Sequence, residues 1–412
     1  MNLDISYEDY KKKLDIHGTV LYPAMMVAPV QRDVLKWLMD GRKGLRVLDP
    51  FQGAGTALYE AATITPDIIL IGYDINPLAS LITLVKLQGV DNQTIDSDIK
   101  NLEELIHRDF EFTPEPFYKS DKWFRSDIFY TLSKIKYAIQ EISNKQNRQY
   151  FWIMLCDIIR YYSNTRSSTF KLHKKKQEKI DALKNAICKD YIKKVKVSLK
   201  FYKLNFRNFV LTKGNSLELI KKIPASSVDI VVTSPPYGDN ATTVTYGQFS
   251  YLPLSFIDKK DIPFEGWELN NCQILDSSSM GGTCSLDLKD EDRKYIQWYI
   301  SRISSPKRKK VERFFADYFN FLDSACRVSK EYIDLTLGNR TVDRVRINLS
   351  RITVRYLQDK GFVHIRTLSR SIVLKRTPDQ ILVNGIKTTT ITKEYIVIMK
   401  KVEAKITNDI CS

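Results

Sequence analysis

Residues 47–61, VLDPFQGAGTALYEA, pass from an apolar run through a turn with two glycines into a helical pattern. The apolar run at 45–51 predicts a short buried strand. Gly53 and Gly55 allow a tight turn beneath a ligand, because glycine adopts backbone conformations that other residues avoid. A second apolar run, at 68–74, ends in an acid. Strand, glycine turn, helix and strand within about thirty residues predict a parallel α/β sheet with helices on both faces.

The remaining chain divides into a helical block and a second strand-rich part. Residues 96–205 carry apolar side chains at helical spacing and include a lysine-rich stretch. Strand patterns resume at residue 206, whereas the segment of about 258–312 has little periodicity and suggests a mobile loop. We therefore expect one α/β domain, formed by residues 1–95 and 206–405 and interrupted by a helical, basic insertion at 96–205.

The positive charge of the chain is concentrated in one region. The 412 residues carry a formal net charge of +16, and between Arg160 and Lys213 sixteen Lys and Arg stand against three acidic residues. Such a concentration is typical of a protein that binds a polyanion. A solvated helix surface without a partner is the alternative.

The composition also argues against several classes of protein. No apolar run reaches the roughly 20 residues of a membrane helix. The N-terminal residues show no apolar secretory signal, so we expect a cytoplasmic protein that does not contact a membrane. The six cysteines are scattered without a CxxC pair, which argues against a disulfide framework and against structural zinc. The four histidines are dispersed, and we expect no metal site.

Two acids flank the glycine turn. Asp49 stands at its head, and Asp74 ends the next apolar run about twenty residues further on. A carboxylate in the position of Asp74 can accept two hydrogen bonds from a ribose diol. The acid at Asp49 suits an ammonium-bearing ligand better than a pyrophosphate, which it would repel. S-adenosylmethionine has both a ribose and an α-ammonium group, so the pattern indicates this cofactor. A turn with a purely structural role is the alternative.

The stretch VVTSPPYGDN, residues 231–240, closes a β-branched run with two prolines. Because proline donates no backbone hydrogen bond, Pro235 and Pro236 exclude a central strand and predict a rigid turn. D-P-F-x-G-x-G-T, the acidic strand end and T-S-P-P-Y together resemble the amino-methyltransferases that act on exocyclic amines of DNA bases. The resemblance covers about residues 17–95 and 206–400. It implies a Rossmann-like S-adenosylmethionine-dependent methyltransferase sheet.

The resemblance also implies a chemical role for the turn. The S-P-P-Y form resembles most the cytosine N4 enzymes, whereas adenine N6 enzymes usually carry D-P-P-Y. An exocyclic amine is a weak nucleophile because its lone pair is delocalised into the ring. Acceptors at Ser234 and at the Pro235 carbonyl would orient the amine, and Tyr237 would stack on the base. Flipping the base out of the duplex costs a few kcal/mol, of which stacking returns roughly 1–3 kcal/mol.

The candidate site residues follow from these motifs. The predicted catalytic residues are Ser234, Pro235, Pro236 and Tyr237. The predicted cofactor-binding residues are Tyr22, Pro23, Asp49, Pro50, Phe51, Gly53, Gly55, Thr56, Asp74, Ile75, Asn76 and Asn215. Core packing is the alternative for Tyr22 and Pro23, and a loop cap is the alternative for Asn215. Asn240 and Tyr246 are further candidates for the base pocket.

The insertion lies between the cofactor motif and the catalytic motif, where the resemblance implies a target-recognition region. Its predicted DNA-binding residues are Arg166, Lys171, Lys174, Lys175 and Lys176. Double-stranded DNA is therefore the expected partner. A separate restriction endonuclease acting on the same site is a second expected partner, because the resemblance implies the modification enzyme of a restriction-modification system.

The sequence leaves alternatives to cytosine N4 methylation open. Adenine N6 methylation is the first. An RNA or tRNA methyltransferase shares the cofactor motif but typically has Asn in place of Ser234. A DNA-binding protein with a degenerate methyltransferase fold is the non-enzymatic alternative. A 5-methylcytosine enzyme is disfavoured, because such enzymes use a cysteine that usually follows a proline and none of the six cysteines does.

Overall fold

The computed structural model describes residues 5, 7–238, 244–265, 267–268, 272–278, 280, 282, 287–372, 380–383, 386–389 and 393–402. Its centre is a seven-stranded sheet with the strand order β3-β2-β1-β4-β5-β11-β8. These strands are β1 Leu45–Asp49, β2 Ile68–Asp74, β3 Phe209–Lys213, β4 Val228–Thr233, β5 Ser329–Gly338, β8 Phe362–Ser371 and β11 Lys393–Lys401. The α/β, Rossmann-like fold that the sequence predicts is confirmed.

The direction of the strands follows from their sequences. β1 to β5 are parallel, and β1, β2 and β4 are mostly buried apolar runs, as in a sheet covered on both faces. β11 is antiparallel to both β5 and β8. The first five strands therefore all end at one edge of the sheet, where the motif residues also stand.

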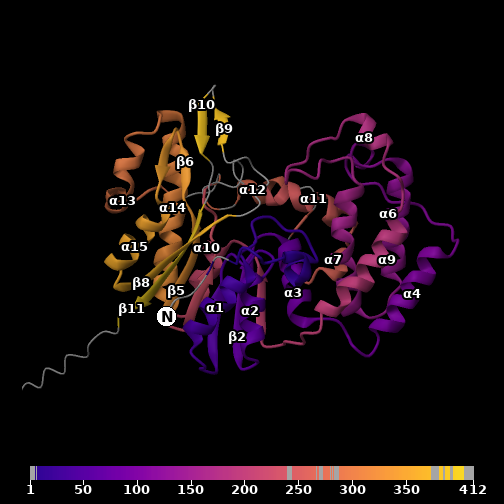
Figure 1. The fold of residues 1–412 in the computed structure, drawn as a ribbon, viewed down its shortest axis with the longest axis horizontal. Coiled ribbons are helices and arrows are strands. Elements are labelled where there is room, and N and C mark those ends of the chain that lie inside the picture. The colour runs from indigo at the N-terminus through magenta and orange to yellow at the C-terminus, as the bar shows by residue number, and fades with distance from the viewer. Residues whose placement is uncertain are drawn as a thin grey trace, which may run out of the picture.

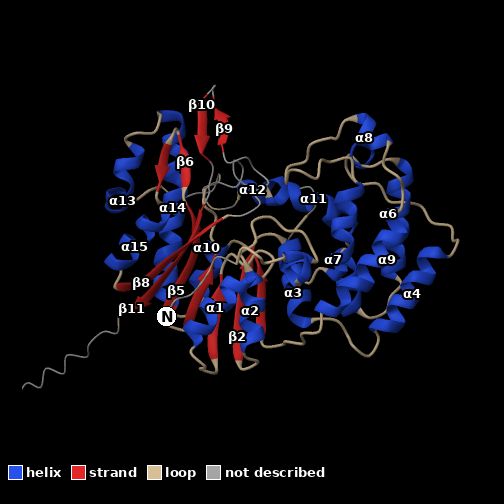
Figure 2. Cartoon of the chain, viewed as in Figure 1, coloured by secondary structure: helices blue, strands red, loops and turns tan. Residues whose placement is uncertain are grey.

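Helices cover both faces of the sheet (Figure 2). The first face packs against α1 Ala28–Met39 and α2 Thr56–Ile64. The second packs against α14 Ser305–Val328 and α15 Leu349–Asp359. Further helices near the sheet are η1 Lys12–Leu14, η2 Ile16–Gly18, α3 Pro77–Gln88, α10 Ser216–Leu219, η4 Ile220–Lys222, α12 Cys272–Ser277 and α13 Asp290–Ile300.

A block of helices lies at one side of the sheet, where Figure 1 draws it in purple and magenta. Its elements are α4 Ile95–His107, α5 Ser120–Trp123, α6 Ser126–Gln140, α7 Lys145–Tyr162, α8 Gln177–Asp181, α9 Ile187–Ser198 and η3 Leu199–Phe201. The α7 helix is almost entirely buried and shares one apolar core with α3 and with α11 Tyr246–Phe256. This core ties the block to helices that follow β2 and β4.

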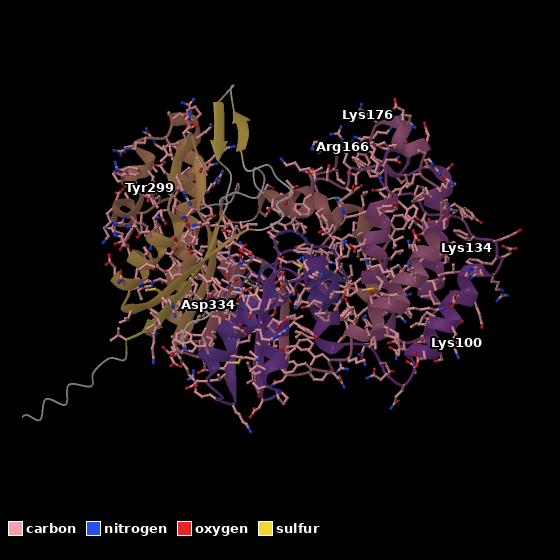
Figure 3. All side chains as sticks on the ribbon, in the orientation of Figure 1. Lys100, Lys134, Arg166, Lys176, Tyr299 and Asp334 are labelled. Atoms are coloured by element: carbon pink, nitrogen blue, oxygen red, sulfur yellow. The ribbon has the colours of Figure 1, made fainter. Side chains whose placement is uncertain are left out.

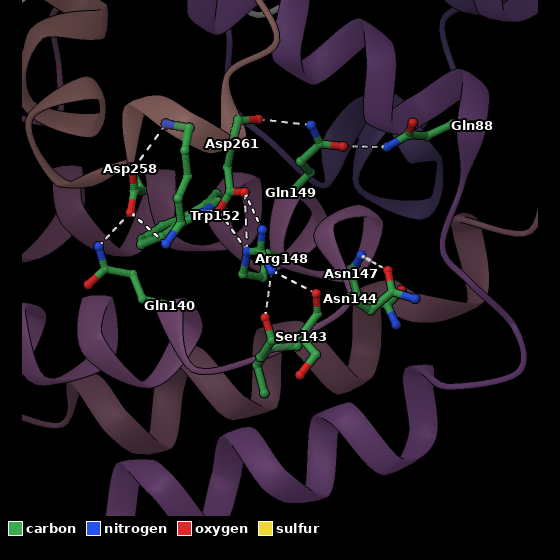
Figure 4. A network of polar contacts seen from close by, with 12 residues as sticks. Gln88, Gln140, Ser143, Asn144, Asn147, Arg148, Gln149, Trp152, Asp258 and Asp261 are labelled. Carbon is green, nitrogen blue, oxygen red and sulfur yellow. Dashed lines mark hydrogen bonds and ion pairs between the residues drawn. The ribbon is translucent and has the colours of Figure 1, made fainter.

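Polar contacts fix the block to the chain beyond α11. The carboxylate of Asp261, which ends η5 Lys259–Asp261, is buried and accepts hydrogen bonds from Arg148 and from Trp152 Nε1 at 2.8 Å (Figure 4). Gln149 Nε2 donates to the Asp261 backbone carbonyl at 2.8 Å and accepts from Gln88 of α3. A paired and fully hydrogen-bonded buried charge specifies a single arrangement of these helices.

Two sequence predictions are wrong in the C-terminal part. The segment of about 258–312, predicted as a loop, contains α13 and the start of α14. Tyr295, Ile296 and Ile300 of α13 are buried, but the flanking charged residues hide their helical pattern in the sequence. Residues 341–362 have the spacing of a basic amphipathic helix in the sequence. Their start is instead a hairpin, formed by β6 Arg340–Val342 and β7 Val345–Ile347 and followed by α15.

The described strands also include a second hairpin, β9 Gln380–Val383 with β10 Ile386–Thr389. Of the helices in the described residues, none combines the length and the apolar character needed to cross a membrane.

Candidate active site

A pocket lies at the edge of the sheet where β1, β2 and β4 end. Nine of the predicted cofactor residues line it, namely Tyr22, Pro23, Phe51, Gly53, Thr56, Asp74, Ile75, Asn76 and Asn215. Ser234 and Pro236 of the predicted catalytic turn line the same pocket. The structure thus brings together two motifs that stand far apart in the sequence. Carboxyl ends of parallel strands are the usual place for such a site.

Asp74 is held at the end of β2 by the backbone around the pocket. Its Oδ2 accepts a hydrogen bond from Gly53 N at 2.9 Å, and its Oδ1 accepts one from Asn76 N at 2.8 Å. Burial raises the pKa of Asp74 to about 6, and these backbone donors lower it in part. Each carboxylate oxygen keeps lone-pair capacity for a further donor. The carboxylate can therefore accept hydrogen bonds from a ligand hydroxyl while it fixes the glycine turn.

The glycine turn depends on backbone conformations with positive φ. Gly53 has φ 49° and Gly55 has φ 69°, and Gly55 caps the start of α2. A Cβ on Gly55 would lie 2.5 Å from Thr83 Cγ2 of α3, so this position also needs the absence of a side chain. Thr83 in turn donates its hydroxyl hydrogen to the Gly53 carbonyl at 3.1 Å. The turn is thus fixed by both conformation and packing.

Asp49, Pro50 and Gly55 are not among the residues that line the pocket. For Asp49 the predicted contact with an ammonium group stays a prediction. Asp49 is fully buried, and its Oδ1 accepts hydrogen bonds from Thr233 Oγ1 at 2.6 Å and from Phe51 N at 3.1 Å. Its role in the structure is to join the end of β1 to the end of β4. Burial raises its pKa to about 7.

A second buried acid lies close to Asp49. Asp334 of β5 is paired with Val232 in the sheet register and is fully buried. Among the described residues, neither Asp334 carboxylate oxygen has a hydrogen-bond partner, and Asp49 Oδ2 has none either. Burial, and secondarily the charge of Asp49, raises the pKa of Asp334 to about 7. No sequence motif predicts this acid beneath the site.

The catalytic turn places two hydroxyl groups together. Ser234 Oγ and Tyr237 Oη are 2.9 Å apart and share a hydrogen bond. Tyr237 does not line the pocket, and its ring packs against the apolar core beside α14 and α15. Pro235 is also absent from the lining, whereas Pro236 contributes to it. The predicted stacking of Tyr237 on a base therefore stays a prediction, and the structure shows instead that its hydroxyl holds Ser234.

Three of the predicted cofactor residues also form hydrogen bonds within the protein. Asn76 caps α3 by accepting from Leu78 N, and its Nδ2 donates to Tyr22 Oη at 3.1 Å and to Ser250 Oγ at 2.7 Å. Asn215 caps α10 by accepting from Leu217 N, which is the alternative considered for it. All the same, both asparagines and Tyr22 line the pocket.

Several pocket residues were not predicted. Tyr246 stacks on Tyr22 with ring centroids 5.7 Å apart and lines the pocket, as its candidacy suggested, whereas Asn240 lies outside the described residues. The unpredicted lining residues are Ala24, Met25, Met26, Gln52, Ala54, Ser216, Leu217, Leu275, Ser278 and Met280. Ala24, Met25 and Met26 directly follow the predicted Tyr22 and Pro23, so their nearness in the sequence was a usable signal.

A buried network of polar side chains contacts the backbone of the glycine turn. Lys86 Nζ of α3 donates to the Ala54 carbonyl at 2.7 Å and lies 3.2 Å from His17 Nδ1. His17 Nε2 is 2.9 Å from the buried Glu60 carboxylate, which also binds Arg32. Burial lowers the pKa of Lys86 to about 7. No sequence motif pointed to these residues, because they come from separate helices.

The predicted DNA-binding residues of the insertion differ in their surroundings. Arg166, Lys174 and Lys176 are exposed, and Figure 3 shows Arg166 and Lys176 at the same upper end of the helical block. Burial raises the pKa of Asp276 in α12, and the charge of Lys171 partly opposes this rise, so Lys171 lies near the pocket-lining Leu275. Lys175 is different, because its Nζ donates to the backbone carbonyls of Tyr161 and Ser163. Its ammonium thus has a structural role in the folded protein, and its contact with DNA stays a prediction.

The parallel strands, the antiparallel β11 and the pocket at the carboxyl edge define a Rossmann-like methyltransferase fold. No protein-family model matches the chain. The chain is 27% identical over 418 residues to the Type II methyltransferase M.MvaI of Kocuria varians, and the match covers 93% of this chain and 90% of that protein. The fold and this relative together support a methyltransferase enzyme.

Solved structures give weaker similarities. TrmN from Thermus thermophilus matches 91% of this chain at 12% identity and a TM-score of 0.28, and the match spans 49% of the TrmN chain. A protein of Pyrococcus horikoshii described as a candidate RNA methyltransferase matches 90% of this chain and 84% of its own, at 12% identity and a TM-score of 0.30. The fold assignment rests on the strand order and not on these two similarities.

Proposed function

We propose that this protein is an S-adenosylmethionine-dependent DNA methyltransferase that modifies the N4 amine of cytosine. The observation that carries the proposal is the shared pocket: Asp74 and Gly53 line it together with Ser234 and Pro236. A methyl donor held by the first pair would lie next to an amine oriented by Ser234. Holding two reactants in line is itself a large part of catalysis for such a transfer.

The residues of the pocket fit S-adenosylmethionine. Asp74 offers buried carboxylate oxygens suited to a ribose diol. Gly53 presents no side chain to the pocket, and its φ of 49° is a backbone conformation that favours glycine. Apolar walls for an adenine and a methionine chain come from Phe51, Leu217 and Met26. When bound, the cofactor supplies a methyl group on a positively charged sulfur.

The catalytic turn is suited to orient an amine. Neither Pro235 nor Pro236 has a backbone N–H, so the turn offers acceptors without competing donors. If Ser234 donates its hydroxyl hydrogen to Tyr237 Oη, the Ser234 lone pairs remain available to accept from the amine. The amine nitrogen would then turn its own lone pair toward the methyl group. As the nitrogen–methyl bond forms, the methyl–sulfur bond would break and leave a neutral thioether, and the amine would lose one proton to solvent without a covalent bond to the protein.

Double-stranded DNA is the proposed substrate. The relative from Kocuria varians is named a Type II methyltransferase, and Lys171 of the basic insertion acts electrostatically on Asp276 of α12, the helix that contributes Leu275 to the pocket. The serine in T-S-P-P-Y favours cytosine N4 over adenine N6. As part of the same proposal, the protein protects DNA from a separate restriction endonuclease that recognises the same site.

The test uses purified protein, mixed-sequence duplex DNA and isotope-labelled S-adenosylmethionine, followed by digestion to nucleosides and mass spectrometry. We expect labelled N4-methylcytosine. Labelled N6-methyladenine would keep the mechanism and overturn the choice of base. Label in structured RNA but not in DNA would overturn the substrate. Asp74→Asn is the companion variant, and we expect it to weaken cofactor binding in a direct titration without DNA, because the amide loses the charge that strengthens hydrogen bonds from the diol.

A further inference from the structure

The β6–β7 hairpin is a compact projection at the end of β5. Its register pairs Arg340 with Ile347, Thr341 with Arg346 and Val342 with Val345. The two turn residues, Asp343 and Arg344, have φ values of 48° and 66°, as in the tight turns that match the twist of two strands. A positive φ at an arginine is strained, so the surroundings must hold the turn in place.

Contacts at the tip supply that support. The Asp343 carboxylate accepts hydrogen bonds from Ser304 N at 3.0 Å, from Ser304 Oγ and from Lys307 Nζ, so the tip is tied to the start of α14. Val342 and Ile347 are buried in the core shared with α14 and α15. Since the buried residues and Arg340 share one face of the ladder, Thr341 and Arg346 belong to the opposite face. The hairpin is therefore a fixed support for its exposed side chains.

The base of the hairpin touches the catalytic turn. A Cβ on Gly238, which directly follows Tyr237, would lie 2.0 Å from Arg340 Nη1, so the Arg340 guanidinium packs on the backbone of the turn. Arg346 Nη2 is 3.4 Å from Tyr395 Oη of β11. Arginine side chains thus follow the hairpin from the catalytic turn outward.

Arg344 and Arg346, the arginines farther from the catalytic turn, can bind an anionic partner. Arg344 and Arg346 are both exposed. Within the described part of the chain, neither forms an ion pair with a carboxylate. Lys309 and Lys310, two further exposed cations, lie in the first turns of α14 near the hairpin tip. Guanidinium groups match phosphate oxygens with two parallel hydrogen bonds, which suits them to a nucleic acid backbone.

We propose that the β6–β7 hairpin binds the phosphate backbone of the DNA next to the flipped base, through Arg344 and Arg346. Arg340 lies between these contacts and the catalytic turn. Figure 1 shows the hairpin and α8 on opposite sides of the pocket-lining α12, so the hairpin and the basic insertion would hold the duplex from two flanks. This inference rests on the proposed DNA methyltransferase function and adds a binding element that lies outside the insertion.

The experiment compares salt dependence of duplex binding by fluorescence anisotropy. Three proteins are titrated with the same labelled DNA: wild type, the hairpin variant Arg344→Gln/Arg346→Gln and the control Lys100→Gln/Lys134→Gln. The control removes two charges at the far end of the helical block, where Figure 3 labels both lysines. We expect the slope of log affinity against log salt to fall by about two in the hairpin variant alone. Cofactor binding without DNA should be equal in all three proteins, which verifies folding.

The possible results distinguish a failure of the hairpin proposal from a failure of the proposed methyltransferase function. A steep slope in wild type that persists unchanged in the hairpin variant would overturn the hairpin proposal and leave the proposed function intact. A wild type that does not bind duplex DNA, or that binds structured RNA more tightly, would overturn both. If the salt slope falls equally in the hairpin variant and in the control, DNA binding depends only on net charge, which also overturns the hairpin proposal.

Discussion

Ser234 is the residue on which the proposed chemistry depends most directly. Its hydroxyl lies at the pocket and shares a hydrogen bond with Tyr237, whose ring is anchored in the core. The core thus fixes the tyrosine, the tyrosine fixes the serine, and the serine faces the substrate space. Such support by a neighbouring residue keeps an acceptor in position without reorganisation during the reaction.

Ser234→Ala should lower turnover by about 100-fold, the usual cost of losing one oriented hydrogen-bonding group in an active site. The affinity for the cofactor should stay unchanged, because the pocket keeps Asp74 and Gly53. Tyr237→Phe serves as the matched control, since it keeps the packed ring and removes only the hydroxyl, and it should have the smaller effect. Single-turnover methylation assays and cofactor titrations measure the two quantities. A parallel loss of cofactor binding in Ser234→Ala would contradict this division of roles.

Asp334 gives the protein a pH-dependent stability. Its folded-state pKa of about 7 lies above the ordinary value of 3.8, because burial disfavours the charge. The folded state therefore holds this proton up to higher pH than the unfolded chain does. The contribution to stability is fully present below about pH 4 and is lost as the pH rises through about 7.

Asp334→Asn should consequently gain stability relative to wild type as the pH rises. Between pH 5 and pH 8 the difference in the free energy of unfolding should shift by roughly 2–3 kcal/mol in favour of the variant. Urea unfolding at several pH values measures it. Asp290→Asn is the control, because the Asp290 side chain is 99% exposed. A difference independent of pH would show that Asp334 does not titrate in this range.

Among the elements, the glycine turn between β1 and α2 is the most constrained. Gly55 combines a positive φ with a close approach to Thr83. Gly41 offers a comparison within the same chain, because it has φ +70° and nothing within 4 Å of its added Cβ. The two positions separate the cost of conformation from the cost of packing.

Gly41→Ala should lower stability by about 1 kcal/mol, the cost of the left-handed conformation. Gly55→Ala should lower it by more, and it should also weaken cofactor binding because the turn must move away from α3. Thermal unfolding and cofactor titration of both variants test this difference. Equal destabilisation by the two substitutions would mean that Thr83 adjusts freely and that packing does not constrain the turn.

The sequence predicted those elements whose signal is local. The strands β1, β2 and β4 are apolar runs ended by an acid, a glycine turn or a proline pair, so their type and their functional ends were visible. The role of Asp49 could not be predicted, because it depends on Thr233, a residue brought next to it by the sheet. Likewise Lys86 meets Ala54 only in the folded chain, and the Asp343–Arg344 turn lacks the glycine that usually marks a hairpin.

At the scale of the whole molecule, two basic regions flank the pocket. The exposed Lys174 and Lys176 belong to the helical block, and Arg344 and Arg346 belong to the hairpin beside the sheet. If one duplex contacts both regions at once, their electrostatic contributions add, since they lie too far apart to share a phosphate contact.

Lys174→Gln/Lys176→Gln should lower the salt slope of DNA binding by about two. Combination with Arg344→Gln/Arg346→Gln should lower it by about four, with a uniform loss of affinity across DNA sequences. Anisotropy titrations of the three variants measure these slopes. A combined variant no worse than either parent would indicate that the two regions do not hold the same duplex together.

The pairing of β2 with β3 has a consequence for how the chain is made. Leu70 pairs with Phe209, so the partner of β2 follows the entire helical block in the sequence. A ribosome needs on the order of ten seconds to synthesise that block. During this time β1 and β2 have no third strand, and β2 presents unpaired backbone groups to its surroundings. Nascent chains that stall before residue 206 would therefore expose an unpaired edge strand, which is a target for chaperones and proteases.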